Sequence, residues 1–215
     1  MKFVGYVTVR VNSTRVPYKS IREIKGVPLV SKAISILNQV DSVAETILYC
    51  SQDWIQSYID SGLKYSFIKR PSYLDGDNIT FNDILESIID DIDGDYIVFL
   101  SCTSPFVKPE TVQDMIGKIE TGDYDSAFLA TELYSFCWFD GTPLNYKLDS
   151  VPRTQDLKPV IQETSGLYIF SKELFKKYKR RIGFNPYIKI VDMLEGWDID
   201  TMDELRIAEY ISCVM

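Results

Sequence analysis

The feature that most constrains the fold is a short, wholly apolar run near the middle of the chain, Tyr96–Leu100 (YIVFL). A run of this length and composition predicts a strand that is buried on both faces, as at the centre of a parallel sheet. Apolar residues at helical spacing flank it, at 81–92 before the run and at 112–119 after it. Because parallel strands need crossover connections, usually helices, this order predicts repeated strand–helix units.

The same alternation continues along most of the chain. Further strands are predicted at 3–9, 46–50, 65–69, 126–131, 166–170 and 187–191, and further helices at 29–40, 54–59, 172–178 and from Met202 onward. We therefore predict an α/β fold with a Rossmann-like, mainly parallel sheet and helices on both faces. Right-handed crossovers place the loops that follow the strands along one edge, where such sheets bind ligands.

The alternation breaks at 132–162. This stretch contains turn signals at Asp140–Gly141 and Pro143, several aromatic residues and no helical period. We interpret it as a hairpin-bearing arm inserted into a single domain that spans 1–215.

Composition excludes several classes of function. The chain has 31 acidic and 23 basic residues, a net charge of −8, which argues against nucleic-acid and anionic-membrane partners. It contains no histidine, which excludes mechanisms that use an imidazole of this chain as a general base or as a metal ligand. Four scattered cysteines predict buried, reduced thiols. No apolar run spans a bilayer, and the N-terminus reads as a first strand, so we expect a cytoplasmic protein.

The loop after the first predicted strand is the first candidate site. Between Arg10 and Lys25 there are five basic residues and one acid, a local reversal of sign in an acidic chain. Such a loop could wrap a triphosphate, with hydroxyl and backbone groups adding hydrogen bonds. The candidates are Arg10, Asn12, Ser13, Arg15 and Lys19. A solvated basic loop is the alternative.

A pair of carboxylates near the C-terminus is the second candidate. Asp198 and Asp200 are two residues apart, so they share a face if the chain is extended there. Such a pair suits Mg²⁺ that is completed by phosphate oxygens and water. The alternative is that Asp200 or Thr201 caps the final helix, for which Thr201 and Glu204 form a capping-box pattern.

Three further segments fall on the predicted ligand edge or near it. The loop that follows the central strand carries several hydroxyl groups. In the segment Arg70–Asp77, the arginine could recognise a planar heterocycle. The segment 153–155 carries an arginine and a glutamine that could contact an acceptor substrate. Each is also compatible with an ordinary structural turn. The candidates are Ser101, Thr103, Ser104, Arg70, Asp77, Arg153 and Gln155.

Together these motifs, in this order, resemble the CMP-sugar-acid synthetases, cytidylyltransferases of the acylneuraminate and 3-deoxy-manno-octulosonate type. The resemblance rests on RVNSTRVPYK after the first strand, RPSYLDGD, TSP, SGLYIF and DID. It implies a nucleotide-diphospho-sugar transferase type of fold. Departures at Ser101, Val107 and Ser165 fall at positions that contact the sugar in the family, so nucleotide recognition transfers better than acceptor identity.

The resemblance implies that CTP and a sugar acid react to give a CMP-sugar and pyrophosphate, with Mg²⁺ on Asp198 and Asp200. Arg10, Lys19 and Asp200 are the expected catalytic residues. Arg70 and Asp77 would then bind the nucleotide. The acceptor would be bound by Ser101, Thr103, Ser104, Arg153, Gln155 and Ser165. The 132–162 arm resembles a dimerisation insert, which predicts a homodimer. Two alternatives stay open: a nucleotide-sugar-dependent glycosyltransferase, and a catalytically inactive nucleotide-binding homologue.

Overall fold

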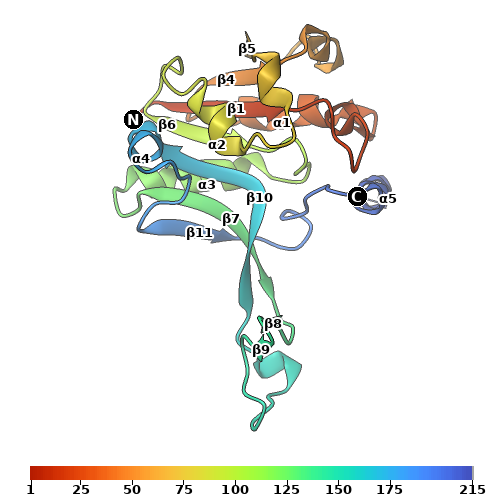
Figure 1. The fold of residues 1–215 in the computed structure, drawn as a ribbon, viewed down its shortest axis with the longest axis vertical. Coiled ribbons are helices and arrows are strands. Elements are labelled where there is room, and N and C mark those ends of the chain that lie inside the picture. Colours follow the sequence, from red (N-terminus) through yellow and green to blue (C-terminus); the bar gives the residue numbers. More distant parts are fainter. Residues whose placement is uncertain (215) are drawn as a thin grey trace.

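The computed structural model describes residues 1–214 and contains a seven-stranded sheet (Figure 1). Its strand order is β11-β7-β10-β6-β1-β4-β5. The strands are β1 (Phe3–Val9), β4 (Val43–Cys50), β5 (Ser66–Lys69), β6 (Tyr96–Leu100), β7 (Ser126–Leu133), β10 (Val160–Ser171) and β11 (Pro186–Ile190). The predicted α/β fold with a Rossmann-like, mainly parallel sheet is confirmed.

Strand direction determines where the site can form. β1 pairs in parallel with both β4 and β6, β5 continues the parallel series beyond β4, and β11 is parallel to β7. Only β10 runs the other way, between β6 and β7. Six of the seven strands therefore end at the same edge of the sheet, and β10 contributes residues from its middle there.

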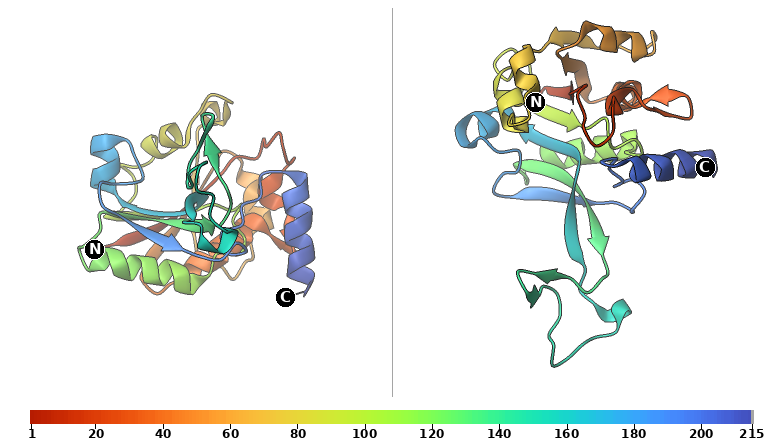
Figure 2. Two further views of the ribbon diagram at one scale, coloured as in Figure 1. Left: turned by 90° about the horizontal axis from the view of Figure 1, so that it is seen from below. Right: turned by 45° about the vertical axis from the view of Figure 1, so that its right-hand side comes forward.

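Helices cover both faces of the sheet (Figure 2). One core cluster packs α1 (Leu29–Asn38), α3 (Pro109–Glu120) and α5 (Met202–Val214) against one face. The other packs α2 (Phe81–Glu86) and α4 (Lys172–Tyr178) against the opposite face. Short 3₁₀ turns at Lys19–Ile21, Asp53–Tyr58, Ser72–Asp75 and Thr154–Asp156, and a small hairpin of β2 (Glu23–Ile24) and β3 (Val27–Pro28), complete the connections.

The helix over 81–92 is shorter than its apolar period predicts. α2 ends at Glu86, although Ile88 and Ile92 are buried as that period requires. The Ser87 hydroxyl donates to the carbonyl of Ile84 at 2.7 Å and contacts the Tyr49 hydroxyl at 2.9 Å. A serine that satisfies backbone groups with its side chain competes with the helical ladder, which accounts for the early end.

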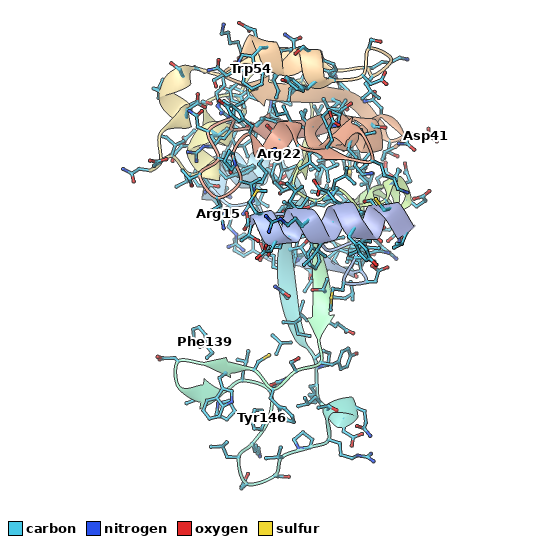
Figure 3. The ribbon with its side chains drawn as sticks, turned by 90° about the vertical axis from the view of Figure 1, so that its right-hand side faces the viewer. Arg15, Arg22, Asp41, Trp54, Phe139 and Tyr146 are labelled. Carbon is cyan, nitrogen blue, oxygen red and sulfur yellow. The ribbon has the colours of Figure 1, made fainter. Side chains whose placement is uncertain are left out.

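The 132–162 stretch projects from the sheet as an arm (Figures 1 and 3). β7 and β10 leave the sheet side by side, and a small hairpin of β8 (Trp138–Phe139) and β9 (Thr142–Pro143) lies beyond them. Asp140 and Gly141 turn this hairpin with φ angles of 48° and 73°, the left-handed pair that a tight hairpin turn requires. Trp138 and Phe139 are 54% and 73% exposed, so the arm presents apolar surface to its surroundings.

Two predictions from composition concern the whole chain. Within 1–214, no helix is long and apolar enough to cross a bilayer. All four cysteines are free thiols, but the prediction that they are buried holds only for Cys50 and Cys102, because Cys137 lies on the arm and Cys213 is exposed on α5.

Candidate active site

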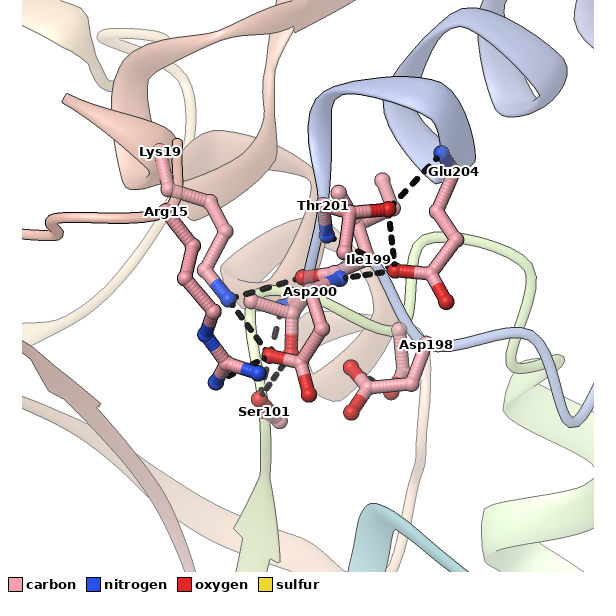
Figure 4. A network of polar contacts seen from close by, with 10 residues as sticks. Arg15, Lys19, Ser101, Asp198, Ile199, Asp200, Thr201 and Glu204 are labelled. Carbon is pink, nitrogen blue, oxygen red and sulfur yellow. Dashed lines mark hydrogen bonds and ion pairs between the residues drawn. The ribbon is translucent and has the colours of Figure 1, made fainter. Parts of the chain in front are cut away.

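Three segments meet at the carboxyl edge of the sheet (Figure 4). They are the basic loop after β1, the hydroxyl-rich loop after β6, and the 198–200 segment that leads into α5. The first and last of these are about 180 residues apart in sequence, as the Lys19–Asp200 contact shows with a separation of 181. The fold therefore joins the two strongest candidates of the sequence analysis into one site.

Asp200 lies against the cations of the basic loop. Its Oδ1 accepts a hydrogen bond from Arg15 Nη2 at 2.9 Å and from Lys19 Nζ at 3.0 Å. Lys19 Nζ also donates to the carbonyl of Ile199 at 2.7 Å. Val16 is fully buried and Tyr18 adopts a left-handed φ of 55°, so the loop is anchored and turned just where Lys19 must face the carboxylate.

Asp198 is held by the loop after β6. The backbone of Ile199 donates to the carbonyl of Thr103 at 2.9 Å, and the Ser104 hydroxyl lies 3.5 Å from Asp198 Oδ1. Ser104 is 2% exposed, so it positions Asp198 from below and does not line a cavity. Gly166 on β10 permits this arrangement, because a Cβ there would lie 2.6 Å from Ser104 Oγ.

The two carboxylates have opposite electrostatic environments. Burial raises the pKa of Asp198 above its ordinary value, and the neighbouring Asp200 charge adds to the rise. Burial would also raise the pKa of Asp200, but the Lys19 hydrogen bond and the charges of Lys19 and Arg15 hold that pKa below its ordinary value. Asp200 is thus neutralised within the chain, whereas Asp198 has no cation in direct contact among the described residues.

The donor set fits a magnesium ion that is completed by substrate. No group of three or more acidic or cysteine side chains within 1–214 could enclose a metal ion. The pair Asp198 and Asp200 therefore offers two carboxylates and leaves the remaining positions to phosphate oxygens and water. Mg²⁺ commonly binds in that way, through one or two carboxylates and substrate phosphates.

A hollow lies on each side of this carboxylate pair. The first, of about 480 Å³, opens over the basic loop and the end of β6. The second, of about 590 Å³, opens between the 190–200 segment and the base of the arm. Predicted residues in the first hollow are Arg10, Asn12, Ser13, Arg15, Lys19, Asp77, Ser101 and Thr103. Those in the second are Ser165, Asp198 and Asp200.

Arg10 also connects two loops. Its Nη2 donates to the carbonyl of Asp75 at 3.1 Å and to that of Gly76 at 3.0 Å, and it lies 4.0 Å from Asp77 Oδ1. The guanidinium is one-third exposed and lines the first hollow. Arg10 therefore holds the 75–77 loop against the basic loop, a contact that sequence spacing did not reveal.

The Arg70 side chain does not lie where the predicted contact with a heterocycle requires it. Its side chain is completely buried, donating to Thr8 Oγ1 at 2.9 Å and to Asp75 Oδ1 at 2.5 Å, with the Tyr49 ring beside it. It does not line the first hollow, although its Nε has no partner within 1–214. The correction follows from burial: Arg70 supports the 70–77 loop from beneath.

Arg153 and Gln155 also differ from the prediction. Both are exposed on the arm, outside the two hollows, and Arg153 Nε is paired with Asp156 at 2.7 Å. The arm carries them away from the sheet edge because β7 and β10 stay paired well beyond it. Within one chain they do not contact the acceptor side of the site.

The helix-cap alternative is resolved by α5. Thr201 Oγ1 accepts from the backbone of Glu204 at 3.3 Å, and Glu204 Oε2 accepts from the backbone of Thr201 at 2.7 Å and of Asp200 at 2.8 Å. Thr201 and Glu204 thus form the capping box, as their pattern predicted. The Asp200 side chain is left free for the basic loop.

Sequence reasoning missed a pair on β10. The Tyr168 hydroxyl donates to Glu163, which lines the second hollow. Residues five apart face opposite sides of a regular strand, but the β10 register shifts between Glu163 and Tyr168. That irregularity brings them together, and Gly166 was the only sequence signal near it.

The fold and the joined polar site define the class of the protein: an α/β nucleotidyltransferase-type domain with a basic loop in contact with a carboxylate pair. A sequence model of the cytidylyltransferase family matches residues 4–206, and the chain belongs to that family. Its fold is similar to that of several solved structures, including a CMP:2-keto-3-deoxy-manno-octonic acid synthetase complexed with CTP (TM-score 0.73, 16% identity, all of both chains covered). Another is a 4-diphosphocytidyl-2C-methyl-D-erythritol synthase from Anaerococcus prevotii (TM-score 0.66, 14% identity, 98% and 96% covered).

Two curated relatives are similar in sequence. An N-acylneuraminate cytidylyltransferase of Streptococcus agalactiae serotype V is 22% identical over 95% of this chain and 52% of its own length. A Helicobacter pylori protein, named pseudaminic acid cytidylyltransferase and UDP-2,4-diacetamido-2,4,6-trideoxy-beta-L-altropyranose hydrolase, is 24% identical over 97% of this chain and 42% of its own length. The chain thus spans about half the length of the curated relatives it matches.

Proposed function

We propose that the chain transfers a cytidylyl group from CTP to a hydroxyl of a sugar acid, giving a CMP-sugar and pyrophosphate. The family and the names of its relatives support this reaction class. The observation that carries it is the contact of Arg15 and Lys19 with Asp200, between two hollows at the carboxyl edge. Each hollow then receives one substrate, the nucleotide over the basic loop and the acceptor beside the arm.

In this proposal the chain acts by positioning and charge. Arg10, Arg15 and Lys19 bind the phosphates and stabilise the negative charge that develops on the leaving pyrophosphate. Asp77, Asn12 and Ser13 complete the nucleotide hollow, while Ser101, Thr103 and Ser165 line the path to the acceptor. Holding the acceptor hydroxyl in line with the α-phosphorus supplies much of the acceleration.

Magnesium is part of the proposal. Asp198 and Asp200 would hold the ion, and its charge would polarise the phosphate and favour ionisation of the acceptor hydroxyl. The raised pKa of Asp198, caused first by burial, marks a carboxylate that a cation would stabilise. With Asp200 holding the ion, Arg15 and Lys19 would be free to bind the triphosphate.

We also propose a homodimer that forms through the arm, and a cytoplasmic location where CTP is available. The exposed Trp138 and Phe139 support an apolar contact with a second copy. In such a dimer, Arg153 and Gln155 of the arm could contact the partner's acceptor hollow. Sedimentation of the intact protein and of a Trp138→Ser/Phe139→Ser variant tests the arm: the variant should shift to monomer, and an unchanged dimer would contradict the assignment.

The experiment that tests the function is pyrophosphate release with each of the four nucleoside triphosphates, against N-acetylneuraminate and 3-deoxy-manno-octulosonate. We expect release with CTP and an acid together, and none when either is omitted. No release with any combination, by a protein that binds CTP in calorimetry, would favour the inactive homologue. Transfer from a preformed nucleotide-sugar without pyrophosphate would instead indicate a glycosyltransferase.

A further inference from the structure

The hollow proposed for the acceptor contains negative charge and no basic residue. Its lining includes carboxylates from the arm base, from the 190–200 segment and from α5, and neither lysine nor arginine. These carboxylates are Glu132, Glu163, Asp192, Asp198, Asp200 and Glu204. A sugar acid entering this hollow would be repelled unless a cation faces its carboxylate. The cations of the basic loop lie on the nucleotide side, where the triphosphate needs them.

One arginine that packs on aromatic rings near the two hollows has no hydrogen-bond or ion-pair partner among residues 1–214. Arg181, in the turn between α4 and β11, places its Cζ 4.1 Å from the centre of the Tyr168 ring and 4.6 Å from that of Phe81. Phe81 lines the nucleotide hollow, and the Tyr168 hydroxyl donates to Glu163 in the other. The half-buried guanidinium therefore lies against two aromatic rings, one of which lines the nucleotide hollow while the other contacts a residue of the acceptor hollow.

The other arginines in the described part of the chain are all engaged. Each of them donates at least one hydrogen bond to a carbonyl, a hydroxyl or a carboxylate: Arg10, Arg15, Arg22, Arg70, Arg153, Arg180 and Arg206. Arg180, the sequence neighbour of Arg181, stacks on Phe184 and donates to the carbonyl of Gly183, so it stabilises the turn between α4 and β11. Arg181 makes no hydrogen bond or ion pair with any residue of 1–214. Stacking fixes the plane of a guanidinium but leaves the N–H groups at its edge free to bind an anion.

We propose that Arg181 binds the carboxylate of the acceptor and thereby makes the acid-lined hollow selective for sugar acids. The inference rests on the proposed function and adds the residue that recognises the acid group within a single chain. Within one chain Arg181 takes the role predicted for Arg153, because Arg153 of the same chain is exposed on the arm and paired with Asp156. Arg181 is proposed as a binding residue, with no part in the transfer of the cytidylyl group.

The test compares an acid with its neutral ester in two proteins. N-acetylneuraminate and 3-deoxy-manno-octulosonate, each with its methyl ester, are titrated into the CTP-loaded protein by calorimetry and used as acceptors in the pyrophosphate assay. Arg181→Gln should raise the Kd and KM of the preferred acid by roughly 10- to 100-fold, the loss expected for a charge-assisted hydrogen bond. The values for its ester and for CTP should change by less than about threefold. Arg181→Lys, which keeps the charge without the planar fork, should recover part of the loss.

Lys177→Gln is the matched control, since Lys177 is a nearby cation whose ammonium lies over the Tyr178 ring at 5.1 Å. It should leave the acid-to-ester ratio unchanged. An equal loss for acid and ester in Arg181→Gln would show that Arg181 only packs on the rings, and absence of acid binding by the unmodified protein would equally overturn the inference. Acid binding without pyrophosphate release would contradict the proposed function while the Arg181 comparison still gives its result.

Discussion

Replacing Asp200 by asparagine should have opposite effects on nucleotide binding and on turnover. In the structure, the Asp200 carboxylate is paired with Arg15 and Lys19, the cations that we propose bind the triphosphate. The Asp200 side chain is 41% exposed, that of Lys19 is 15% exposed and that of Arg15 is 64% exposed. Solvent therefore screens the Arg15–Asp200 pair more strongly than the Lys19–Asp200 pair. Exposed ion pairs contribute about 0.2–1 kcal/mol each, and we expect the two together to contribute about 1 kcal/mol.

Without divalent cations, Asp200→Asn should therefore bind CTP about fivefold more tightly, since about 1.4 kcal/mol corresponds to a factor of ten. With Mg²⁺, the same variant should lose turnover by about 100-fold or more, because a charged group at the reacting centre is missing. Calorimetry in EDTA and pyrophosphate release in Mg²⁺ measure the two effects. Asp203→Asn, which removes an exposed carboxylate paired only with Arg206, is the control and should change neither. Normal turnover, or weaker metal-free binding, by Asp200→Asn would refute the reasoning.

Three further substitutions test the surrounding structure. Thr201→Ala should lower the free energy of unfolding by about 1 kcal/mol through loss of the α5 cap, as thermal denaturation can measure, without the loss of turnover expected for Asp200→Asn. Gly166→Ala should reduce turnover in the pyrophosphate assay while the variant remains folded. The new Cβ would lie 2.6 Å from Ser104 Oγ and displace that side chain from Asp198. A fully active variant would contradict this. Burial opposes ionisation of Asp125, but hydrogen bonds from the 184–185 backbone and from Ser126 lower its pKa. Its stabilising effect should be present above its unfolded pKa of about 3.8 and be lost as the pH falls through the lower folded value, and Asp125→Asn should flatten that part of the urea-unfolding profile.

The fold was largely predictable because its signals are local. The apolar run of β6 and the helical periods around it identify a parallel sheet, and the Thr201–Glu204 pattern identifies the start of α5. The basic loop and the carboxylate pair were also recognisable from residue type and spacing. Their mutual contact follows from topology, since both lie at the carboxyl edge of the sheet.

The parts that were not predictable depend on contacts between distant segments. Burial of Arg70 requires Thr8 and Asp75 to surround it, and the arm's length decides that Arg153 lies outside the hollows. Glu163 meets Tyr168 only because the strand register shifts between them. Arg181 belongs to no motif that the sequence reveals. Its lack of a polar partner within 1–214 becomes visible only when its contacts are compared with those of the other arginines.

The most direct test of the account is a single comparison of pyrophosphate release. The protein is supplied with Mg²⁺ and N-acetylneuraminate or 3-deoxy-manno-octulosonate, together with CTP, UTP, ATP or GTP in turn. The account predicts release that requires CTP and one of the acids, and that disappears in Asp200→Asn. Release that is independent of the acid, equal release with all four nucleotides, or no release with CTP would contradict the proposal that this site couples CTP to a sugar acid.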